Sequence, residues 1–146
     1  MNALEKVVDL LASVTILFLL PLLYYSSGIH VSQAILAGQA GENFLKRVST
    51  SGNITLPVWK ELEDTLARYG CTAYELQRER RLFEPVGEAG MVAERICTEE
   101  KDGLWKEVRE EGKSRLQKGD RLRLILYVNE VPTMYCAFVR TGDVNP

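Results

Sequence analysis

The apolar and polar positions of this chain follow one pattern near the N-terminus and another over the rest of its length. Residues 10–25, LLASVTILFLLPLLYY, carry no charge, and Val7 and Val8 extend the apolar tract upstream. The consecutive apolar residues 16–20 cover every angle of a helix, whereas a core helix of a soluble protein usually keeps a polar stripe. The tract approaches the about 20 residues that a bilayer-spanning helix needs. The pattern therefore predicts a membrane anchor over about residues 7–25.

A cleaved secretory signal is the alternative to a retained anchor. Such a signal has a basic n-region, a short apolar core and a small-x-small cleavage site. Here Lys6 is offset by neighbouring carboxylates, and Tyr24 and Tyr25 suit an aromatic belt at a membrane interface, which favours a retained anchor. Residues 26–28, Ser-Ser-Gly, could still be cut. We expect a single-pass protein of the cell membrane, with a short N-terminus inside and the C-terminal domain outside.

Helical spacing continues beyond the anchor and predicts one long helix over residues 1–48, amphipathic in its outer half. The recurring positions are Ile29, Gln33, Leu36, Ala37, Ala40 and Phe44. Residues 26–28 are where this helix could break instead. Gly38 and Gly41, with small neighbours, either permit close approach of another helix or form a flexible point at which the long helix bends.

Residues 49–146 are expected to form one small α+β domain. The turn cluster at residues 49–53 ends the long helix, and Thr55 as N-cap with Pro57 in the first turn opens a short helix that closes at Gly70. A second short helix is predicted over residues 99–111, where charged positions form a solvated face. Each short helix has one apolar stripe to bury.

The β signal is clearest near the C-terminus. After a turn at residues 118–120, apolar side chains alternate along residues 121–128 and again along 133–140, which predicts a hairpin. Residues 74–82 favour an edge strand, although residues 75–81 also suit a helix, and residues 83–90 are expected to form a loop. The predicted fold class is α+β: a long N-terminal transmembrane and amphipathic helix packed on a small antiparallel sheet with short helices.

Composition adds few chemical candidates. The formal net charge is -2, and no basic cluster is interleaved with aromatic residues, so we expect no binding of nucleic acid. The sequence has no phosphate loop, GxGxxG or HExxH pattern, and carboxylates alternate with arginines as in ordinary surface ion pairs. His30 is the only histidine and lacks the partners that catalysis assembles. We therefore predict no enzyme, no cofactor, no metal and no small-molecule substrate.

The three cysteines are Cys71, Cys97 and Cys136. Their spacing contains no CxxC or Cys/His pattern, which argues against a zinc site. Two alternatives remain. One is a disulfide plus a free thiol, as a protein outside the cytoplasm can form. The other is three small thiols that are partly buried in the domain.

A resemblance to a known family rests on the predicted plan and on four short segments. The segments are FLKRVSTSGNITL at residues 44–56, YEL at 74–76 with FEP at 83–85, and KGDRLRL at 118–124. These segments and the long, half-embedded helix resemble the pilin-like proteins of tight-adherence (Tad/Flp) pilus systems in Gram-positive bacteria, related in layout to TadE-like minor pilins. In type IV pilins a glutamate at the fifth mature position pairs with a neighbouring N-terminus. Glu5 is fifth from Met1, but no leader ending in glycine precedes the helix, so an interfacial carboxylate near a helix start is the alternative.

The resemblance implies a non-enzymatic, membrane-anchored pilin-like subunit of a pilus or secretion filament. Its partners would be the membrane and other pilin-like subunits or pilus assembly proteins. The candidate assembly residues are Glu5, Leu10, Phe18, Pro21, Leu36 and Phe44. The first alternative is a single-pass accessory protein that binds a partner through its exterior domain, and the second is an exported binding domain with a cleaved signal.

Overall fold

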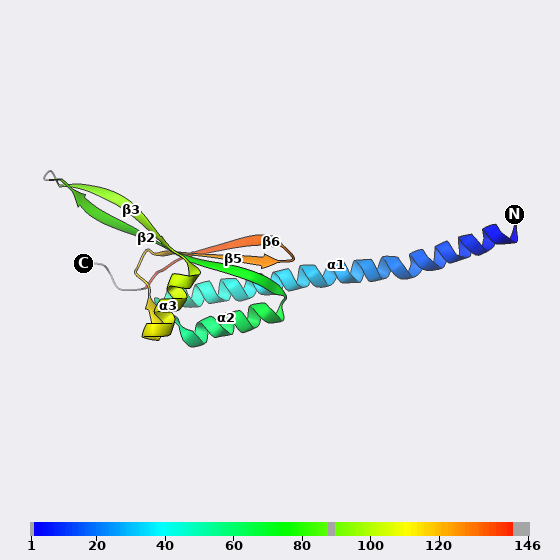
Figure 1. Ribbon diagram of the computed structural model, residues 1–146, viewed down its shortest axis with the longest axis horizontal. Coiled ribbons are helices and arrows are strands. Elements are labelled where there is room, and N and C mark those ends of the chain that lie inside the picture. Colours follow the sequence, from blue (N-terminus) through cyan, green and yellow to red (C-terminus); the bar gives the residue numbers. More distant parts are fainter. Residues whose placement is uncertain (1, 88–89, 142–146) are drawn as a thin grey trace. The chain divides into compact units, whose positions relative to one another are not determined.

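The computed structural model describes residues 2–87 and 90–141, and its fold is the predicted α+β arrangement of a long helix, short helices and antiparallel strands (Figure 1). The chain divides into two compact units, Met1–Gln33 and Ala34–Pro146, which are described separately below. The elements in order are α1 (Ala3–Ser51), β1 (Asn53–Thr55), α2 (Leu56–Arg68), β2 (Cys71–Val86), β3 (Met91–Glu99), α3 (Lys101–Glu111), β4 (Lys113–Arg115), β5 (Arg121–Val128) and β6 (Val131–Phe138).

Helix α1 is continuous through residues 26–28, so the alternative in which the long helix breaks at these residues is wrong. The hydroxyl groups of Ser26 and Ser27 each donate to the carbonyl oxygen of Leu23 at 2.9 Å, which keeps both side chains bonded within the helix. The helix ends at Ser51 rather than at Val48. Gly52 then adopts a φ of 69° and donates to the Val48 carbonyl at 2.9 Å, the left-handed ending for which glycine is favoured.

Both short helices form close to their predicted bounds. Thr55 is the N-cap of α2 with a proline in the first turn, and the helix ends at Arg68, just before Gly70. Helix α3 starts at Lys101, two positions later than Glu99, because β3 continues to Glu99. Each helix buries one stripe: Trp59, Leu62 and Leu66 on α2, and Leu104 and Val108 on α3. The apolar spacing therefore predicted which face of each helix enters the core.

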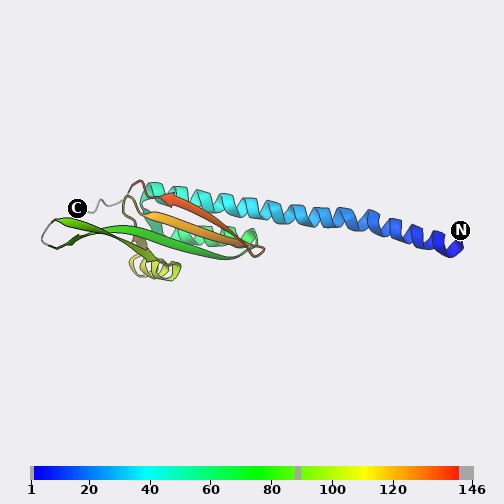
Figure 2. The same cartoon turned by 90° about the horizontal axis from the view of Figure 1, so that it is seen from above.

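The main sheet is antiparallel and has the strand order β3-β2-β5-β6, with a separate pairing of β1 with β4 (Figure 2). The predicted hairpin is β5–β6, and its two turn residues, Asn129 and Glu130, have φ values of 52° and 65°. Two residues with positive φ form the turn that suits the twist of a hairpin. Strand β6 begins at Val131 and includes Pro132, which a strand tolerates at a sheet edge.

Three strand predictions need correction. Residues 74–82 do form a strand, but β2 lies inside the sheet between β3 and β5, not at an edge. Residues 83–86 continue β2 instead of starting a loop, and of the predicted loop only Gly87 and Gly90 are turn residues, with 88 and 89 outside the described residues. Strands β1, β3 and β4 were not predicted. Strand β3 carries no alternation of buried and exposed positions because it is exposed on both faces over residues 91–96.

The core lies within the second compact unit. Strand β5 alternates strictly, with Leu122, Leu124, Leu126 and Val128 buried as the hairpin pattern predicts. The C-terminal part of α1 completes this core with Ala37, Phe44, Leu45 and Val48. The sheet therefore rests on the amphipathic part of α1, as expected, and Figure 1 shows α2 and α3 on the same side of the sheet.

The small residues of α1 serve close approach to the sheet, not to another helix. A Cβ added at Gly38 would clash with the hydroxyl group of Tyr135, and one at Gly41 would lie 3.0 Å from Leu124 Cδ2 and 3.2 Å from Leu126 Cδ1. Both glycines are buried within α1, so the alternative of a flexible bend at these residues also fails.

Replacing Gly41 with leucine is expected to lower the free energy of unfolding of the domain by about 1–3 kcal/mol, because the new side chain overpacks the interface between α1 and β5. The matched control is Gly28→Leu on the same helix, where a Cβ meets nothing within 4 Å. Pulse proteolysis of the detergent-solubilised chain in urea gives the unfolding midpoint of each variant. Equal midpoints for the two variants would contradict this packing.

Candidate functional site: the apolar segment and the exposed sheet surfaces

The first compact unit consists of α1 up to Gln33 and exposes apolar side chains on all sides. Within the described part of the chain, α1 is the one helix long and apolar enough to cross a membrane. Large side chains such as Leu17, Phe18 and Tyr24 are more exposed than buried in this unit. An apolar surface that surrounds a helix needs a nonpolar environment. The structure is thus compatible with the predicted transmembrane anchor.

Four of the candidate assembly residues lie on this apolar segment: Glu5, Leu10, Phe18 and Pro21. Leu10 and Phe18 are exposed. Glu5 has a partner of its own, because the backbone N–H of Asn2 donates to its carboxylate at 3.2 Å. Asn2 precedes the helix and Glu5 lies three residues later, as in a capping box, and this contact supports the alternative in which Glu5 stabilises the helix start.

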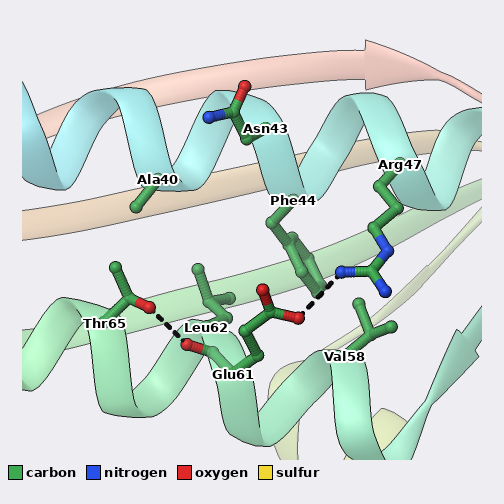
Figure 3. A pocket seen from close by; sticks show the side chains of 8 residues that line it. All are labelled: Ala40, Asn43, Phe44, Arg47, Val58, Glu61, Leu62 and Thr65. Carbon is green, nitrogen blue, oxygen red and sulfur yellow. Dashed lines mark hydrogen bonds and ion pairs between the residues drawn. The ribbon is translucent and has the colours of Figure 1, made fainter.

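The other two candidates lie in the second unit. Leu36 is 40% exposed and available for contact, whereas Phe44 is only 5% exposed. The Phe44 ring lies in a cleft of about 180 Å³ between α1 and α2, across which Arg47 and Glu61 form an ion pair of 2.8 Å (Figure 3). Phe44 therefore belongs to the domain core, and the cleft is smaller than the about 300 Å³ at which ligand pockets begin.

Two arginines predicted as surface residues contact buried groups instead. Arg78 is buried and donates to Ser114 Oγ and to the Arg115 carbonyl, both at 3.1 Å, and to the carboxylates of Glu99 and Glu107. Arg80 pairs with the buried Asp120, with Nη2 2.8 Å from Oδ2. Both arginines share strand parity with Leu76 and Leu82, and this parity is the sequence signal from which their position on the core face could have been predicted.

A second polar cluster joins α2, α3 and β2. Trp59 Nε1 donates to the Tyr74 hydroxyl oxygen at 2.8 Å, and the Tyr74 hydroxyl group donates to Glu63. Lys101 Nζ lies 3.8 Å from the centre of the Tyr74 ring, close enough for a cation–π interaction. Burial and then the hydrogen bond with Glu63 raise the pKa of Tyr74 above that of a free tyrosine.

This raised pKa of Tyr74 predicts a loss of stability in alkali. Above pH ~10 the unfolded chain releases the Tyr74 proton while the folded chain retains it, so the free energy of unfolding falls with pH by less than about 1.4 kcal/mol per unit. Urea midpoints between about pH 9 and about pH 11 measure this fall, in a range that brackets the tyrosine pKa. The Tyr74→Phe variant should show a shallower pH dependence, and an identical slope in both proteins would contradict the assignment.

All three cysteines are free thiols, which favours the second of the two alternatives. Cys71 and Cys97 are partly buried, and burial raises the pKa of the Cys71 thiol. Cys136 is exposed on β6, where Arg121 Nη2 lies 3.7 Å from its sulfur. No group of three His, Cys, Asp or Glu side chains that could hold a metal occurs among the residues that the structure describes.

The face of the main sheet opposite the helices remains uncovered by any described helix (Figures 1 and 2). Strand register places side chains of β3, β2, β5 and β6 on this outer face in columns. At the centre of this face, Arg121 Nη1 lies 3.4 Å from Glu79 Oε2, and Arg123 Nη2 lies 2.7 Å from Glu79 Oε1. Large exposed apolar side chains lie on both sides of these charges: Phe83, Val92 and Ile96 toward β3, and Met134 and Phe138 on β6.

No protein-family model matches this chain, and searches of curated proteins and of solved structures find no significant match. The candidate sites are therefore the ones that its own geometry defines: the apolar segment of α1 and the exposed surfaces of the sheet.

Proposed function

We propose that this chain is a membrane-anchored, non-enzymatic pilin-like subunit of a pilus or secretion filament. Its apolar segment stays in the bilayer until it packs with the corresponding helices of other subunits, and its α+β domain faces outward. The observation that carries the proposal is the structure of α1. One continuous helix is apolar and exposed toward its N-terminus, while its C-terminal part packs on an antiparallel sheet.

Two further features support the proposal. A helix with exposed apolar side chains on every side can exchange lipid for other helices without exposing a polar face, because lipid tails and leucine side chains are equally apolar. The described domain presents exposed apolar side chains on the sheet, where another subunit can dock. These features support an assembly role more directly than a catalytic one.

Placing a charge in the middle of the apolar segment tests the assembly role. Phe18→Lys is expected to reduce strongly the recovery of the chain in filaments sheared from a pilus-producing host, because a lysine at the centre of a membrane helix costs about 2.5–3.5 kcal/mol. The control Phe18→Leu, which keeps the segment apolar, should assemble normally. Quantitative immunoblots of sheared and membrane fractions provide the measurement.

The same fractions separate this function from the alternatives. A wild-type chain found only in membranes would overturn the filament role and favour a single-pass accessory protein. Release of a shortened chain, detected by intact mass, would instead indicate an exported domain with a cleaved signal. In the proposed function the wild-type chain is present in both the membrane and the sheared filaments.

A further inference from the structure

The far half of the β2–β3 hairpin is an unsupported ribbon. Strand β2 pairs with β5 only over residues 71–79, and residues 81–86 pair only with 91–96 of β3. Figure 1 shows this hairpin extending beyond the other strands of the sheet. An isolated two-stranded ribbon is marginally stable in water. Its apolar side chains nevertheless remain exposed, with Val92 at 62% and Ile96 at 60%. The ribbon therefore has the properties of a segment that a partner covers.

The opposite edge of the sheet offers a groove. Residues 134–138 of β6 line a groove of about 680 Å³ together with Glu42, Leu45 and Lys46 of α1. Successive residues of a strand point to alternate faces, so a groove that all five of them line runs along the edge of the strand. Within the described sheet, β6 pairs only with β5, and this edge retains unpaired backbone N–H and C=O groups.

The strand directions make the two edges of the sheet complementary. Each neighbouring pair in the order β3-β2-β5-β6 is antiparallel, so β3 and β6 run in opposite directions. A second copy shifted sideways in the plane of the sheet therefore brings its β3 antiparallel to β6, with both outer faces on the same side. The resulting ladder continues one antiparallel sheet across two subunits.

One register of this ladder matches both apolar and charged side chains. Placing Ile96 opposite Met134 puts Val92 opposite Phe138, and all four side chains are exposed on the outer face. The same register places Glu94 opposite Cys136, next to which Arg121 lies. On the other face it places Arg95 opposite Tyr135, which lines the groove together with Glu42. Glu94 and Arg95, which form exposed ion pairs with Arg81 and Glu84 within their own copy, thus each come close to a residue of opposite charge on the second copy.

We propose that β3 of one copy of this chain adds to β6 of a second copy, in the groove beside α1, with Val92 opposite Phe138 and Ile96 opposite Met134. The two surfaces differ, so the contact is heterologous and can repeat without closing, which generates a linear array of subunits. This inference rests on the proposed filament function and names the contact between the domains. Backbone hydrogen bonds supply the affinity, and the side-chain match selects this chain as its own partner.

Thiol cross-linking of the full-length chain in membranes tests the register. All variants carry Cys71→Ser and Cys97→Ser and retain the native Cys136. Glu94→Cys places a thiol directly opposite Cys136, where opposed Cβ atoms lie about 4.5–5.5 Å apart. A short bifunctional thiol reagent should then give a ladder of dimers and longer oligomers on a non-reducing gel. The matched control is Ala93→Cys, an exposed neighbour of Glu94 that keeps Arg95 in place; its thiol lies on the opposite face and should leave monomers.

Two further sets of substitutions test whether cross-linking depends on the proposed side-chain contacts. Val92→Asp with Ile96→Asp in the Glu94→Cys protein should abolish the ladder, and both sites are exposed, so the domain remains folded. Glu42→Arg and Arg95→Glu in the Glu94→Cys protein should each reduce cross-linking several-fold, and the combination of both should restore it. Restoration by the charge exchange would identify Glu42 as the partner of Arg95.

The outcomes that overturn the proposal are distinct. Equal ladders from Glu94→Cys and Ala93→Cys would indicate random collision, and dimers from Cys136 alone would indicate a symmetric contact. If no ladder forms while the chain is still recovered in sheared filaments, the strand-addition contact is wrong and the proposed function stands. If the wild-type chain is missing from the filaments, the proposed function itself is wrong.

Discussion

Replacing Trp59 with alanine is expected to lower the free energy of unfolding of the domain by about 3–5 kcal/mol, the largest stability effect we predict for a single side chain. Trp59 is fully buried between α2 and the sheet. Its ring lies 5.2 Å from that of Trp105, at an interplanar angle of 54°, and its N–H group donates to Tyr74. The change removes a large apolar volume and leaves the Tyr74 hydroxyl group with one partner fewer, and both losses act in the same direction.

Pulse proteolysis in urea measures this loss, and it does not depend on tryptophan fluorescence, which the substitution itself alters. The control is Lys60→Ala, one position along α2 and exposed, where a change within about 0.5 kcal/mol is expected. Because whole domains are stable by only about 5–15 kcal/mol, the Trp59 variant should unfold at a much lower urea concentration. A midpoint close to that of the control would contradict the position of Trp59 in the core.

The second large effect is expected for Arg78→Ala, with a loss of about 3 kcal/mol. The Arg78 side chain is 9% exposed and bonds the carboxylates of both Glu99 and Glu107, so its removal leaves two negative charges without the cation that joins them. These carboxylates remain partly solvated, which keeps the loss at the lower end of the range for buried ion pairs. Ser114, which is buried, also loses its hydrogen-bond partner.

Arg81→Ala on the same strand is the matched control for Arg78→Ala. Arg81 forms an ion pair with Glu94 at 3.4 Å, but both side chains are well exposed, and such pairs contribute about 0–1 kcal/mol. Urea midpoints for the two variants should therefore differ clearly. If both substitutions cost the same, the burial of Arg78 in the structure is wrong.

How much of this fold the sequence predicts depends on how each segment is buried. The anchor and β5 were predicted because their patterns are extreme: no polar position over residues 16–20, and strict alternation from Leu122 to Val128. Strand β3 was missed because its outer half touches no core and therefore carries no periodic signal. Without β3, nothing in the sequence could show that β2 is an inner strand.

The candidate site also has features that the local sequence predicts and features that depend on contacts between distant segments. The exposed apolar helix follows from the local sequence, because hydrophobicity on all sides needs no tertiary information. Phe44 was predicted to face other subunits, yet it contacts α2, because helical spacing identifies an apolar face without identifying what covers it. The pairing of Arg78 with Glu99 and Glu107 depends on contacts between distant segments, which no local pattern specifies.

The packing of α1 against the sheet determines where a water-soluble fragment of this chain must begin. Cutting after Val48 removes Ala37, Phe44, Leu45 and Val48, and the inner faces of β5 and β6 lose their cover. A fragment that starts at Ala34 keeps these residues and omits the apolar segment. Recombinant work on the domain can therefore start at Ala34, because such a fragment keeps its core and lacks the segment that requires detergent.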